Sequence, residues 1–453
     1  MTTGTPRNEA ESPAGPLDRF RTLVGIPTIS RSDESLTDWA EFDRFTTTVQ
    51  SLYPLLHAAL DRETVGEHSL LYRWVGTHEG PPAVLMAHMD VVPATDEGWD
   101  YPPFGAVLVG EGADQELWGR GTLDDKGALV CILEAIERLV ARGHRPRNDV
   151  YLSFGHNEET AGDGATQAVA LLAGRGIRPS FVLDEGGAIV EGVFPTVDAP
   201  VAFIGVSEKG ITTALLTVEQ VGGHASTPPR VTATARLAKA IVRLNRRPFP
   251  ARLSPVTREM VSTLGHHARG PLKAIFRGVR FTAPLLAVAF ARLGDETNAM
   301  IRTTQAVTRL SGSDGANVLA ERATATVNIR VAVGSTVGEA MDHVKRAIRD
   351  DAVKVTILEE SEPSPVSPTT GEAWSLLTNT IGEIYPTVVV APYIQLGASD
   401  SRRYTAISDH VYRFTPFEMS SDERATLHAK NERIHVATWL RGIDFYETLA
   451  SRL

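Results

Sequence analysis

The sequence predicts an α/β protein in which a mainly parallel-sheet domain is interrupted by an inserted, two-layer α+β domain. Three observations predict this class. Up to residue 204, continuous apolar runs alternate with amphipathic helical patterns. Beyond residue 204, the strand patterns alternate between apolar and polar residues, as in a sheet with one solvated face. From residue 363 onward, helical patterns and apolar strands return.

The elements of the first segment follow from these periodicities. Helical patterns cover residues 17–26, 40–60, 124–143 and 165–176. Apolar strands cover residues 83–92, 149–159 and 179–187. Strands that are apolar throughout are typical of a parallel sheet covered by helices on both faces.

The middle and last segments complete the expected domain organisation. Alternating strands cover residues 210–221, 322–333 and 352–360, and helices cover 232–247 and 337–350. Helices also cover residues 369–386 and 435–453. We therefore expect one domain built from residues 16–204 and 363–453, and an inserted domain over 205–362. Residues 1–15 are polar and lack the apolar core of a secretory signal, so we expect a disordered lead.

The composition argues against several classes of protein and of site. The net charge is -10, from 45 Lys+Arg against 55 Asp+Glu, which argues against a general nucleic-acid binder. Cys131 is the one cysteine, so an internal disulfide and a thiolate metal site are excluded, and we expect a buried core thiol. The apolar run 281–293 is short and contains Pro284 and Arg292, so we expect a buried or interface helix rather than a membrane span. A cytoplasmic protein is expected.

Polar residues gather where the apolar strands end. They are His88 and Asp90, then Glu158 and Glu159, then Asp184 and Glu185. Asp124 and Asp125 begin the long helix, where negative charge is favoured. Sites in open α/β sheets form outside the carboxyl ends of the strands, so these groups should converge. Carboxylates gathered in this way repel one another unless cations lie between them. Two divalent metal ions that share one carboxylate would supply the positive charge. Zn²⁺ accepts such mixed histidine and carboxylate ligands.

Strand geometry assigns roles to neighbouring residues. Alternation places His88 and Asp90 on one face, so Asp90 can accept the second ring N–H of His88. Glu158 and Glu159 are adjacent and point in different directions, so one can bind a metal while the other takes a proton from a water. We predict Glu158 as the base and Glu159 as the ligand.

Five motifs carry a family resemblance. The runs "AHMD", "GRGTLDDKG", "GHNEE", "LDEGG" and "LHAKNERI" occur in this order along the chain. In order and spacing they resemble the M20 family of dinuclear zinc metallopeptidases and aminoacylases. "DEGG" and "GVSEKG" look like its carboxypeptidase S branch, which includes the N-fatty-acyl-amino-acid hydrolases. The resemblance extends from about Pro16 to the C-terminus.

The resemblance implies a ligand set and a catalytic base. The implied metal ligands are His88, Asp124 as the bridge between two ions, Glu159, one acid of the "LDEGG" run, and His428 from the last segment. Asp184 and Glu185 both qualify for the "LDEGG" position, and we favour Asp184. Glu158 is the implied base and Asp90 the partner that orients His88, while the bond after Asp124 is a cis peptide in this family. Two Zn²⁺ ions are expected, with Co²⁺ or Mn²⁺ as substitutes.

Residues of the inserted domain are implied to contact the substrate. His224, in "VGGHASTPP", resembles a histidine that reaches across a dimer to the scissile carbonyl oxygen. Arg330, with Asn317, resembles the group that binds the substrate carboxylate. The inserted domain is thus an expected lid and dimerisation domain, and a homodimer is implied. Asn157 departs from the family pattern, where Asp is usual, and it flanks the base.

These expectations converge on a metal-dependent amidohydrolase. A metal-bridging hydroxide attacks the amide of a carboxylate-bearing substrate, either the C-terminal residue of a peptide or an N-acyl amino acid. Apolar residues 276–293 fit an acyl site, a lid and a dimer surface equally well. One alternative is a catalytically inactive relative that binds amino-acid conjugates. A nucleotide-binding α/β enzyme is a further alternative, but the glycine fingerprint after its first strand is absent.

Overall fold

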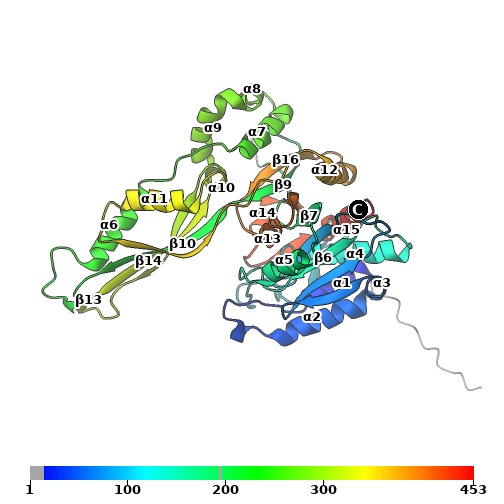
Figure 1. The fold of residues 1–453 in the computed structure, drawn as a ribbon, viewed down its shortest axis with the longest axis horizontal. Coiled ribbons are helices and arrows are strands. Elements are labelled where there is room, and N and C mark those ends of the chain that lie inside the picture. Colours follow the sequence, from blue (N-terminus) through cyan, green and yellow to red (C-terminus); the bar gives the residue numbers. More distant parts are fainter. Residues whose placement is uncertain (1–14, 193–195) are drawn as a thin grey trace, which may run out of the picture.

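The chain forms two lobes in a computed structural model that describes residues 15–192 and 196–453. The larger lobe contains both the N-terminal and the C-terminal parts of the chain, and the elongated second lobe is built from the middle of the chain (Figure 1). The expected disordered lead, 1–15, lies outside the described residues except for Gly15.

A ten-stranded sheet runs through the larger lobe. Its strand order is β1-β2-β6-β3-β7-β17-β9-β8-β18, and β16 also pairs with β9. The strands are β1 (Asp61–Val65), β2 (Ser69–Trp74), β3 (Ala83–His88), β6 (Val150–Gly155), β7 (Phe181–Asp184), β8 (Ile189–Val190), β9 (Val201–Glu208), β16 (Val389–Gln395), β17 (Val411–Arg413) and β18 (Glu418–Met419). The central strands β6, β3, β7 and β17 are parallel, which confirms the mainly parallel sheet.

Helices cover both faces of this sheet. One face packs against α1 (Pro16–Val24), α2 (Trp39–Leu52), α3 (Pro54–Ala59), α4 (Lys126–Ala141), α12 (Glu372–Ile384) and α15 (Val436–Ala450). The other face packs against α5 (Gly164–Gly174) and α13 (Ser401–Tyr404).

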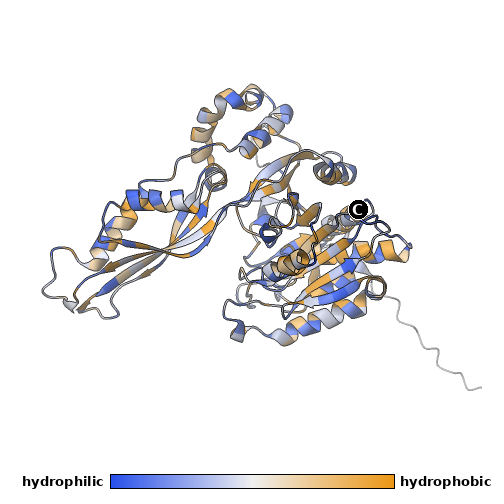
Figure 2. Cartoon of the chain, viewed as in Figure 1, coloured by the Kyte–Doolittle hydropathy of each residue, from blue (hydrophilic) through white to orange (hydrophobic). Residues whose placement is uncertain are grey.

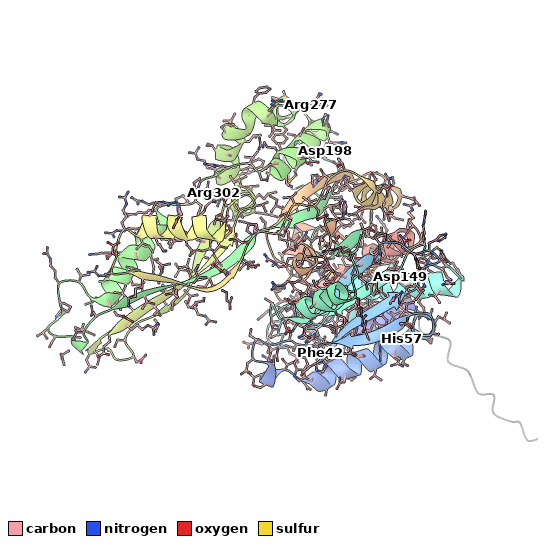
Figure 3. The ribbon with its side chains drawn as sticks, viewed as in Figure 1. Phe42, His57, Asp149, Asp198, Arg277 and Arg302 are labelled. Atoms are coloured by element: carbon pink, nitrogen blue, oxygen red, sulfur yellow. The ribbon has the colours of Figure 1, made fainter. Side chains whose placement is uncertain are left out.

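Figure 2 shows hydrophobic residues concentrated in the central strands, and Phe42, labelled in Figure 3, is a fully buried residue of α2. Cys131 is buried on α4, as expected, and its thiol lies 3.4 Å from the carbonyl oxygen of Trp439.

The second lobe contains a four-stranded antiparallel sheet with two helices. The strands β12 (Thr304–Ser311), β14 (Arg322–Val331), β10 (Gly210–Glu219) and β15 (Lys354–Ser361) lie in this order. Helices α6 (Ala233–Asn245) and α11 (Val337–Ile348) cover one face. Alternate residues of β14 are buried, which accounts for the alternating sequence pattern. The chain passes from the larger sheet to this one at Lys209, between β9 and β10, rather than at residue 205.

A helical segment projects from the junction of the lobes. It contains α7 (Pro255–His267), α8 (Leu272–Arg277), α9 (Val279–Leu293) and α10 (Asp295–Met300), and Arg277 marks its outer end in Figure 3. Helix α9 is half-buried: Leu286 and Phe290 are buried, whereas Phe281 is 85% exposed. In the described part of the chain, no helix is both long and apolar enough to cross a membrane.

Short elements complete the fold. They are β4 (Val107–Val109), β5 (Glu116–Trp118), β11 (Gly223–His224), β13 (Val318–Leu319), α14 (Ser421–Arg424), β19 (Arg433–His435) and the 3-10 turns Glu34–Leu36 and Gly112–Asp114. Strand β19 pairs with β5, which holds the last segment of the chain beside the loop that leads to α4.

Candidate metal centre

His88 ends β3 and points into a cluster of carboxylates. Its Nε2 lies 3.0 Å from Oδ1 of Asp124 and 3.8 Å from Oε1 of Glu185. Its Nδ1 lies 2.9 Å from the carbonyl oxygen of Asp90 and 3.3 Å from the Asp90 carboxylate. An Nδ1–H that donates to Asp90 leaves Nε2 as the ligand atom, which is the orientation expected from the strand alternation.

The Asp90 carboxylate also holds the Glu158–Glu159 turn that follows β6. It accepts hydrogen bonds from the backbone N–H of Glu158 (3.2 Å) and of Glu159 (3.1 Å), and from the hydroxyl of Ser30 (2.6 Å). Burial opposes ionisation of Asp90, but these bonds and His88 lower its pKa below the ordinary value. One ionised carboxylate therefore fixes both the histidine and the neighbouring glutamate pair.

Asp124 lies between two groups of ligand atoms. Its Oδ1 faces His88, while its Oδ2 lies 2.9 Å from Nε2 of His428. The first group is His88, Asp124 and Glu185, and the second is Asp124, Glu159 and His428, with the ligand atoms of each group within 4.8 Å of one another. The Asp124–Asp125 peptide bond is cis, as the family resemblance implies. A carboxylate shared in this way has the position of a bridge between two ions.

Glu159 and His428 bring the second group together from distant parts of the sequence. Oε2 of Glu159 lies 3.0 Å from Nε2 of His428, whereas its Oε1 is buried with no hydrogen-bond partner among the described residues. Hydrogen bonds to Asp124 and Glu159 raise the pKa of His428 to about 10. Without metal, this imidazole therefore carries a proton in the position that a cation would take.

Glu158 faces the same cavity but belongs to neither ligand group. A cavity of about 190 Å³ is lined by Glu158 together with Asp124, Glu185 and His428. Burial raises the pKa of Glu158 well above the ordinary value, and although His88 opposes this effect, the carboxylates of Asp400 and Asp124 add to it. This placement suits a proton acceptor beside the ligands.

The geometry favours Glu185 over Asp184 as the acid of the "LDEGG" run. Asp184 is the last residue of β7, and its Oδ2 accepts a hydrogen bond from the backbone N–H of Ser401 at 2.8 Å. Glu185 points the other way, toward His88 and Asp124. We therefore replace the expected Asp184 with Glu185, because the Asp184 carboxylate is already bound to the start of α13.

The chemistry of these residues fits divalent ions. Burial is the largest of the effects that raise the pKa of Glu159 and of Glu185, and the negative charge of Asp124 raises both further. A bound cation would relieve this repulsion between the carboxylates. It would also supply a partner for the Glu159 oxygen that has no hydrogen bond among the described residues. Two imidazoles and three carboxylates are ligands that Zn²⁺ accepts.

The substrate-contact residues expected in the inserted segment lie at opposite ends of the four-stranded sheet. Arg330 pairs with Ile211 at the inner end, next to the larger lobe. His224 and Asn317 lie beyond the outer end, where His224 pairs with Val318 and the imidazole contacts Ser226. Strand rise alone separates the two ends by roughly 30 Å. Asn317 and Arg330 of one chain therefore lie far apart, and their expected roles in binding the substrate carboxylate stay predictions.

The two residues that precede Glu158 have structural roles. The Asn157 side chain accepts a hydrogen bond from the backbone N–H of Gly164, the first residue of α5, at 3.2 Å. It therefore supports the start of that helix. Nδ1 of His156 lies 2.6 Å from the hydroxyl of Ser69, and its ring packs near Trp39, so His156 is a structural histidine.

Asp400 is a carboxylate of this region that the sequence analysis did not single out. Burial, followed by repulsion from Asp184 and Asp90, raises its pKa to about 7. It lies against Gly155, where an added Cβ would come within 2.6 Å of its Oδ2. A side chain at position 155 would therefore displace the Asp400 carboxylate.

Glu432 shapes the loop that carries Asp124. One of its oxygens accepts hydrogen bonds from the backbone N–H of Gly121 (3.0 Å), Leu123 (2.8 Å) and Asp124 (3.2 Å). The other accepts from Arg120 at 2.6 Å, and both side chains are buried. The "LHAKNERI" motif therefore supplies a positioning carboxylate besides His428.

Replacement of Glu432 by glutamine is expected to destabilise the metal-free protein by about 3 kcal/mol, because it removes the charge that pairs with buried Arg120. It should also lower metal affinity, because the Asp124 loop loses its support. Urea unfolding and metal titration check both effects. Glu63→Gln, which breaks an exposed pair with Arg175, is the matched control and should cost at most about 1 kcal/mol. Equal effects of the two changes would contradict the positioning role.

Comparisons with known proteins show the family of this chain. Residues 84–452 match the model of the peptidase family M20/M25/M40. The chain is 36% identical over 438 residues to the N-fatty-acyl-amino acid synthase/hydrolase PM20D1 of Xenopus tropicalis, covering 95% of this chain and 84% of that protein. It is 28% identical to carboxypeptidase S of Saccharomyces cerevisiae, with 96% and 84% covered.

A solved structure shares the fold. The M20 family metallo-carboxypeptidase Sso-CP2 of Sulfolobus solfataricus superposes with a TM-score of 0.71 at 17% identity, covering 97% of this chain and 99% of that one. The family match spans most of the sequence, and the PM20D1 relative exceeds a third identity over nearly the whole chain. The chain belongs to the peptidase family M20/M25/M40, a family of metal-dependent hydrolases.

Proposed function

We propose that this protein is a metal-dependent amidohydrolase that cleaves the amide bond of a substrate with a free carboxylate. One observation carries the proposal: Asp124 belongs to both ligand groups, and Glu158 faces the same cavity without belonging to either. A shared carboxylate with a separate base beside it is the arrangement that hydrolysis at a two-metal site requires.

Five residues would hold the two ions. His88, Asp124 and Glu185 would bind one, and Asp124, Glu159 and His428 the other. When bound, such ions polarise a carbonyl and lower the pKa of water toward about 7. Zn²⁺ suits these ligands, with Co²⁺ or Mn²⁺ as substitutes.

Glu158 performs the proton transfers. It takes a proton from the attacking water as the new C–O bond forms, and it delivers this proton to the nitrogen of the leaving amine as the C–N bond breaks. Asp90 keeps both the Glu158 turn and His88 in place for this step. Asp90 is therefore a positioning residue.

Arg330 binds the substrate carboxylate when the lobes close. It lies at the inner end of β14, its side chain is half-buried, and its Nε donates to Asn328 at 3.3 Å. A planar guanidinium suits a carboxylate partner. Closure about the β9–β10 junction would bring this group toward the metal centre and exclude water.

His224 of the partner subunit stabilises the oxyanion in a homodimer formed through the second lobe. In one chain His224 lies at the outer end of that lobe, far from the larger one (Figure 1), so it needs a second chain to act. An imidazole N–H aimed at the carbonyl oxygen stabilises the charge that develops there.

His224→Ala should lower kcat about a hundredfold, the effect of losing one oxyanion donor. Mixing inactive His224→Ala and Glu158→Ala chains should restore activity to about a quarter of the wild-type value, because half of randomly paired dimers contain one intact site. Unfolding and refolding the mixture ensures exchange of chains. Mixed dimers that stay inactive would show that His224 does not act across the dimer.

The substrate class is tested by a hydrolysis screen. The names of the relatives point to N-fatty-acyl amino acids and to peptide C-termini. We expect cleavage of dipeptides or N-acyl amino acids that a chelator abolishes and Zn²⁺ or Co²⁺ restores. Parallel amide substrates with the carboxylate capped should react far more slowly, because Arg330 then lacks its ligand. A metal-loaded protein that cleaves none of them would instead indicate an inactive relative that binds amino-acid conjugates.

A further inference from the structure

The outer face of α9 is apolar, although its inner face already packs against the larger lobe. Phe276 of α8 and Leu286 and Phe290 of α9 belong to a buried cluster with residues of β8, β9 and β16. A surface helix that is buried on one face usually presents polar residues on the opposite face. The opposite face of α9 instead carries four large apolar side chains: Phe281 (85% exposed), Leu285 (61%), Leu293 (57%) and Val288 (49%).

These four side chains form one stripe along the helix. With 3.6 residues per turn, their spacing places them within an arc of about 140° around the helix axis. The other exposed residues of α9 are Arg280, Pro284, Ala289 and Arg292, so no acidic side chain interrupts the stripe. Single exposed apolar residues are ordinary, but a contiguous apolar stripe is typical of an interaction surface.

The segment that carries the stripe has only positive charges. Residues 260–294 contain no Asp or Glu, although the net charge of the whole chain is -10. The exposed cations of this segment are Arg269, Lys273, Arg277, Arg280 and Arg292. Arg269 pairs with Asp198 at 2.6 Å, whereas the described residues form no ion pair with the other four. The stripe is therefore flanked by cations whose charge is not neutralised within the chain.

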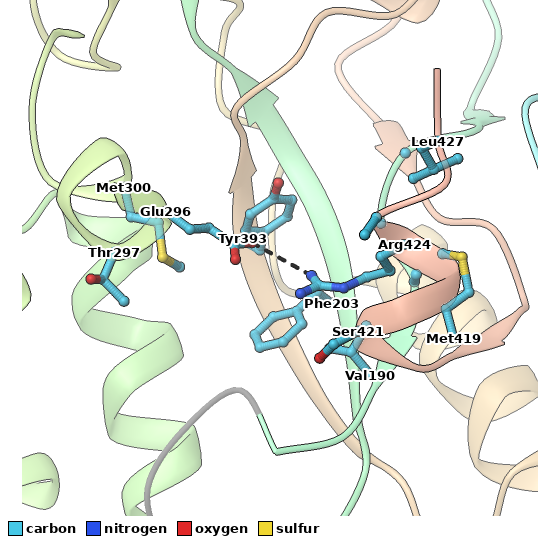
Figure 4. A pocket seen from close by; sticks show the side chains of 14 residues that line it. Val190, Phe203, Glu296, Thr297, Met300, Tyr393, Met419, Ser421, Arg424 and Leu427 are labelled. Atoms are coloured by element: carbon cyan, nitrogen blue, oxygen red, sulfur yellow. Dashed lines mark ion pairs between the residues drawn. The ribbon is translucent and has the colours of Figure 1, made fainter. Parts of the chain in front are cut away.

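The acidic residue Glu296, just beyond this segment, is already paired elsewhere. It begins α10 together with Asp295, and it lines a cavity of about 530 Å³ between α10 and α14. There it lies 3.5 Å from Arg424 (Figure 4). In contrast, α8 and α9 project away from both sheets (Figure 1), with Arg277 at their outer end (Figure 3). The cations and the stripe are thus accessible to a large external surface.

We propose that this outer face of α8 and α9 docks onto an anionic lipid bilayer. The α8–α9 face consists of the four apolar side chains of the stripe and the four unpaired cations. At a membrane surface, apolar side chains enter the boundary of the acyl chains while Lys and Arg contact the anionic headgroups. A bilayer therefore complements both parts of the face. The docking requires neither the metal ions nor the proposed reaction.

Two other occupants match the face less well. In a symmetric pair of chains joined through this face, the same cations would lie opposite one another and repel. A nucleic acid supplies negative phosphates, but it offers no apolar medium for Phe281 and Leu285 to enter. A bilayer is the occupant that accommodates the positive charge and the apolar stripe together.

Vesicle flotation with the full chain tests the docking. Vesicles of phosphatidylcholine alone are compared with vesicles of an equimolar mixture of phosphatidylcholine and phosphatidylserine. We expect the protein to float with the mixed vesicles and not with phosphatidylcholine alone. Added salt should weaken this binding, because it screens the attraction between the cations and the headgroups. A protein that does not float with the mixed vesicles would overturn the proposal.

Two triple variants test the role of the cations. Lys273→Gln/Arg277→Gln/Arg280→Gln should weaken binding to mixed vesicles roughly a hundredfold, since each cation near an anionic surface contributes about fivefold. The matched control, Lys239→Gln/Arg246→Gln/Lys345→Gln, removes three exposed cations of the second lobe and should leave binding nearly unchanged. Equal effects of the two triple variants would show that net charge, not the α8–α9 face, determines binding.

A charge within the stripe tests the role of the apolar side chains. Leu285→Glu should weaken binding at least about tenfold, because the carboxylate opposes entry into the acyl region. Leu36→Glu is the matched control, since Leu36 is 65% exposed in the turn Glu34–Leu36, and it should have little effect. Full binding by Leu285→Glu would contradict insertion of the stripe.

A fluorescent probe distinguishes insertion from charge attraction alone. The one natural cysteine, Cys131, is buried, so Phe281→Cys can be labelled selectively with an environment-sensitive fluorophore. Its emission should shift to the blue with mixed vesicles, as expected for an apolar environment. The same probe at Leu36→Cys should not respond. Equal responses at the two positions would overturn the proposal.

The remaining controls identify the other occupants. Analytical ultracentrifugation without lipid would reveal a self-association that Leu285→Glu abolishes, and that result would assign the face to a second copy. Duplex DNA that displaces the mixed vesicles would assign it to a nucleic acid. Either result would show the proposal to be wrong. All substituted side chains are exposed, so folding should tolerate these changes, and thermal unfolding of each variant confirms this.

Discussion

Glu158→Gln is expected to abolish measurable turnover while the protein keeps its full metal content. A general base typically contributes a factor of about 10² to 10⁴, and glutamine accepts no proton. The side chain faces the small cavity beside Asp124 and His428 but belongs to neither ligand group, so metal binding should not change. Steady-state kinetics and elemental analysis of the same sample check both parts.

The adjacent residue provides the matched contrast. Glu159→Gln is the same chemical change one position along, but Glu159 contacts His428 and belongs to the second ligand group. It should lose metal as well as activity. If Glu158→Gln loses metal and Glu159→Gln keeps it, the roles of the two glutamates are reversed.

Asp124→Ala is expected to lose both ions and all activity, because the two oxygens of Asp124 face the two histidines of different ligand groups. His428→Ala removes a ligand of the second group alone, so it should retain about one of two ions. Metal bound to the native state stabilises it, so Zn²⁺ should raise the Tm of wild type strongly and that of Asp124→Ala little. Elemental analysis measures the number of bound ions, and thermal unfolding with and without chelator measures the stabilisation by Zn²⁺.

An Asp124→Ala protein that keeps one tightly bound ion would show that Asp124 serves a single site. The stability of the metal-free variant must be measured alongside. In the metal-free protein the Asp124 carboxylate pairs with the imidazoles of His88 and His428, so its loss can also destabilise the fold. Loss of metal with an unchanged fold is the expected result.

The strand-end residues could be predicted because the geometry of a parallel sheet is general. His88 is the last residue of β3, and Glu158 and Glu185 come just after β6 and β7. These strands are neighbours in the sheet, so the convergence of the three residues follows from the sheet geometry alone. The pairing of His88 with Asp90 likewise follows from strand alternation. His428 could be placed only through the family resemblance, since it comes from a loop of the last segment.

Other features depend on contacts between distant segments. The choice between Asp184 and Glu185 depends on the backbone N–H of Ser401, more than two hundred residues away. Asp400 and Glu432 come close to the site only because α13 and the loop before β19 pack there. Arg330 and Asn317 lie close in sequence, yet a long strand separates them in space. Periodicity alone does not carry such information.

The fold also combines features that local sequence patterns predict with features that depend on contacts between distant segments. Apolar and alternating patterns predicted both sheets, but the second lobe begins at Lys209 because β9 continues straight into β10. The helical segment α7–α10 was anticipated only as a single helix near 281–293. Its α10 forms one wall of a cavity of about 530 Å³, which no local sequence pattern indicated.

The proposed function depends above all on two metal ions that share Asp124. A crystal of the Zn²⁺-loaded protein, measured at wavelengths on both sides of the zinc absorption edge, tests it most directly. We expect two anomalous peaks, one among His88, Asp124 and Glu185 and the other among Asp124, Glu159 and His428, with Glu158 close by but not a ligand. A single peak, or two ions that do not share Asp124, would contradict it.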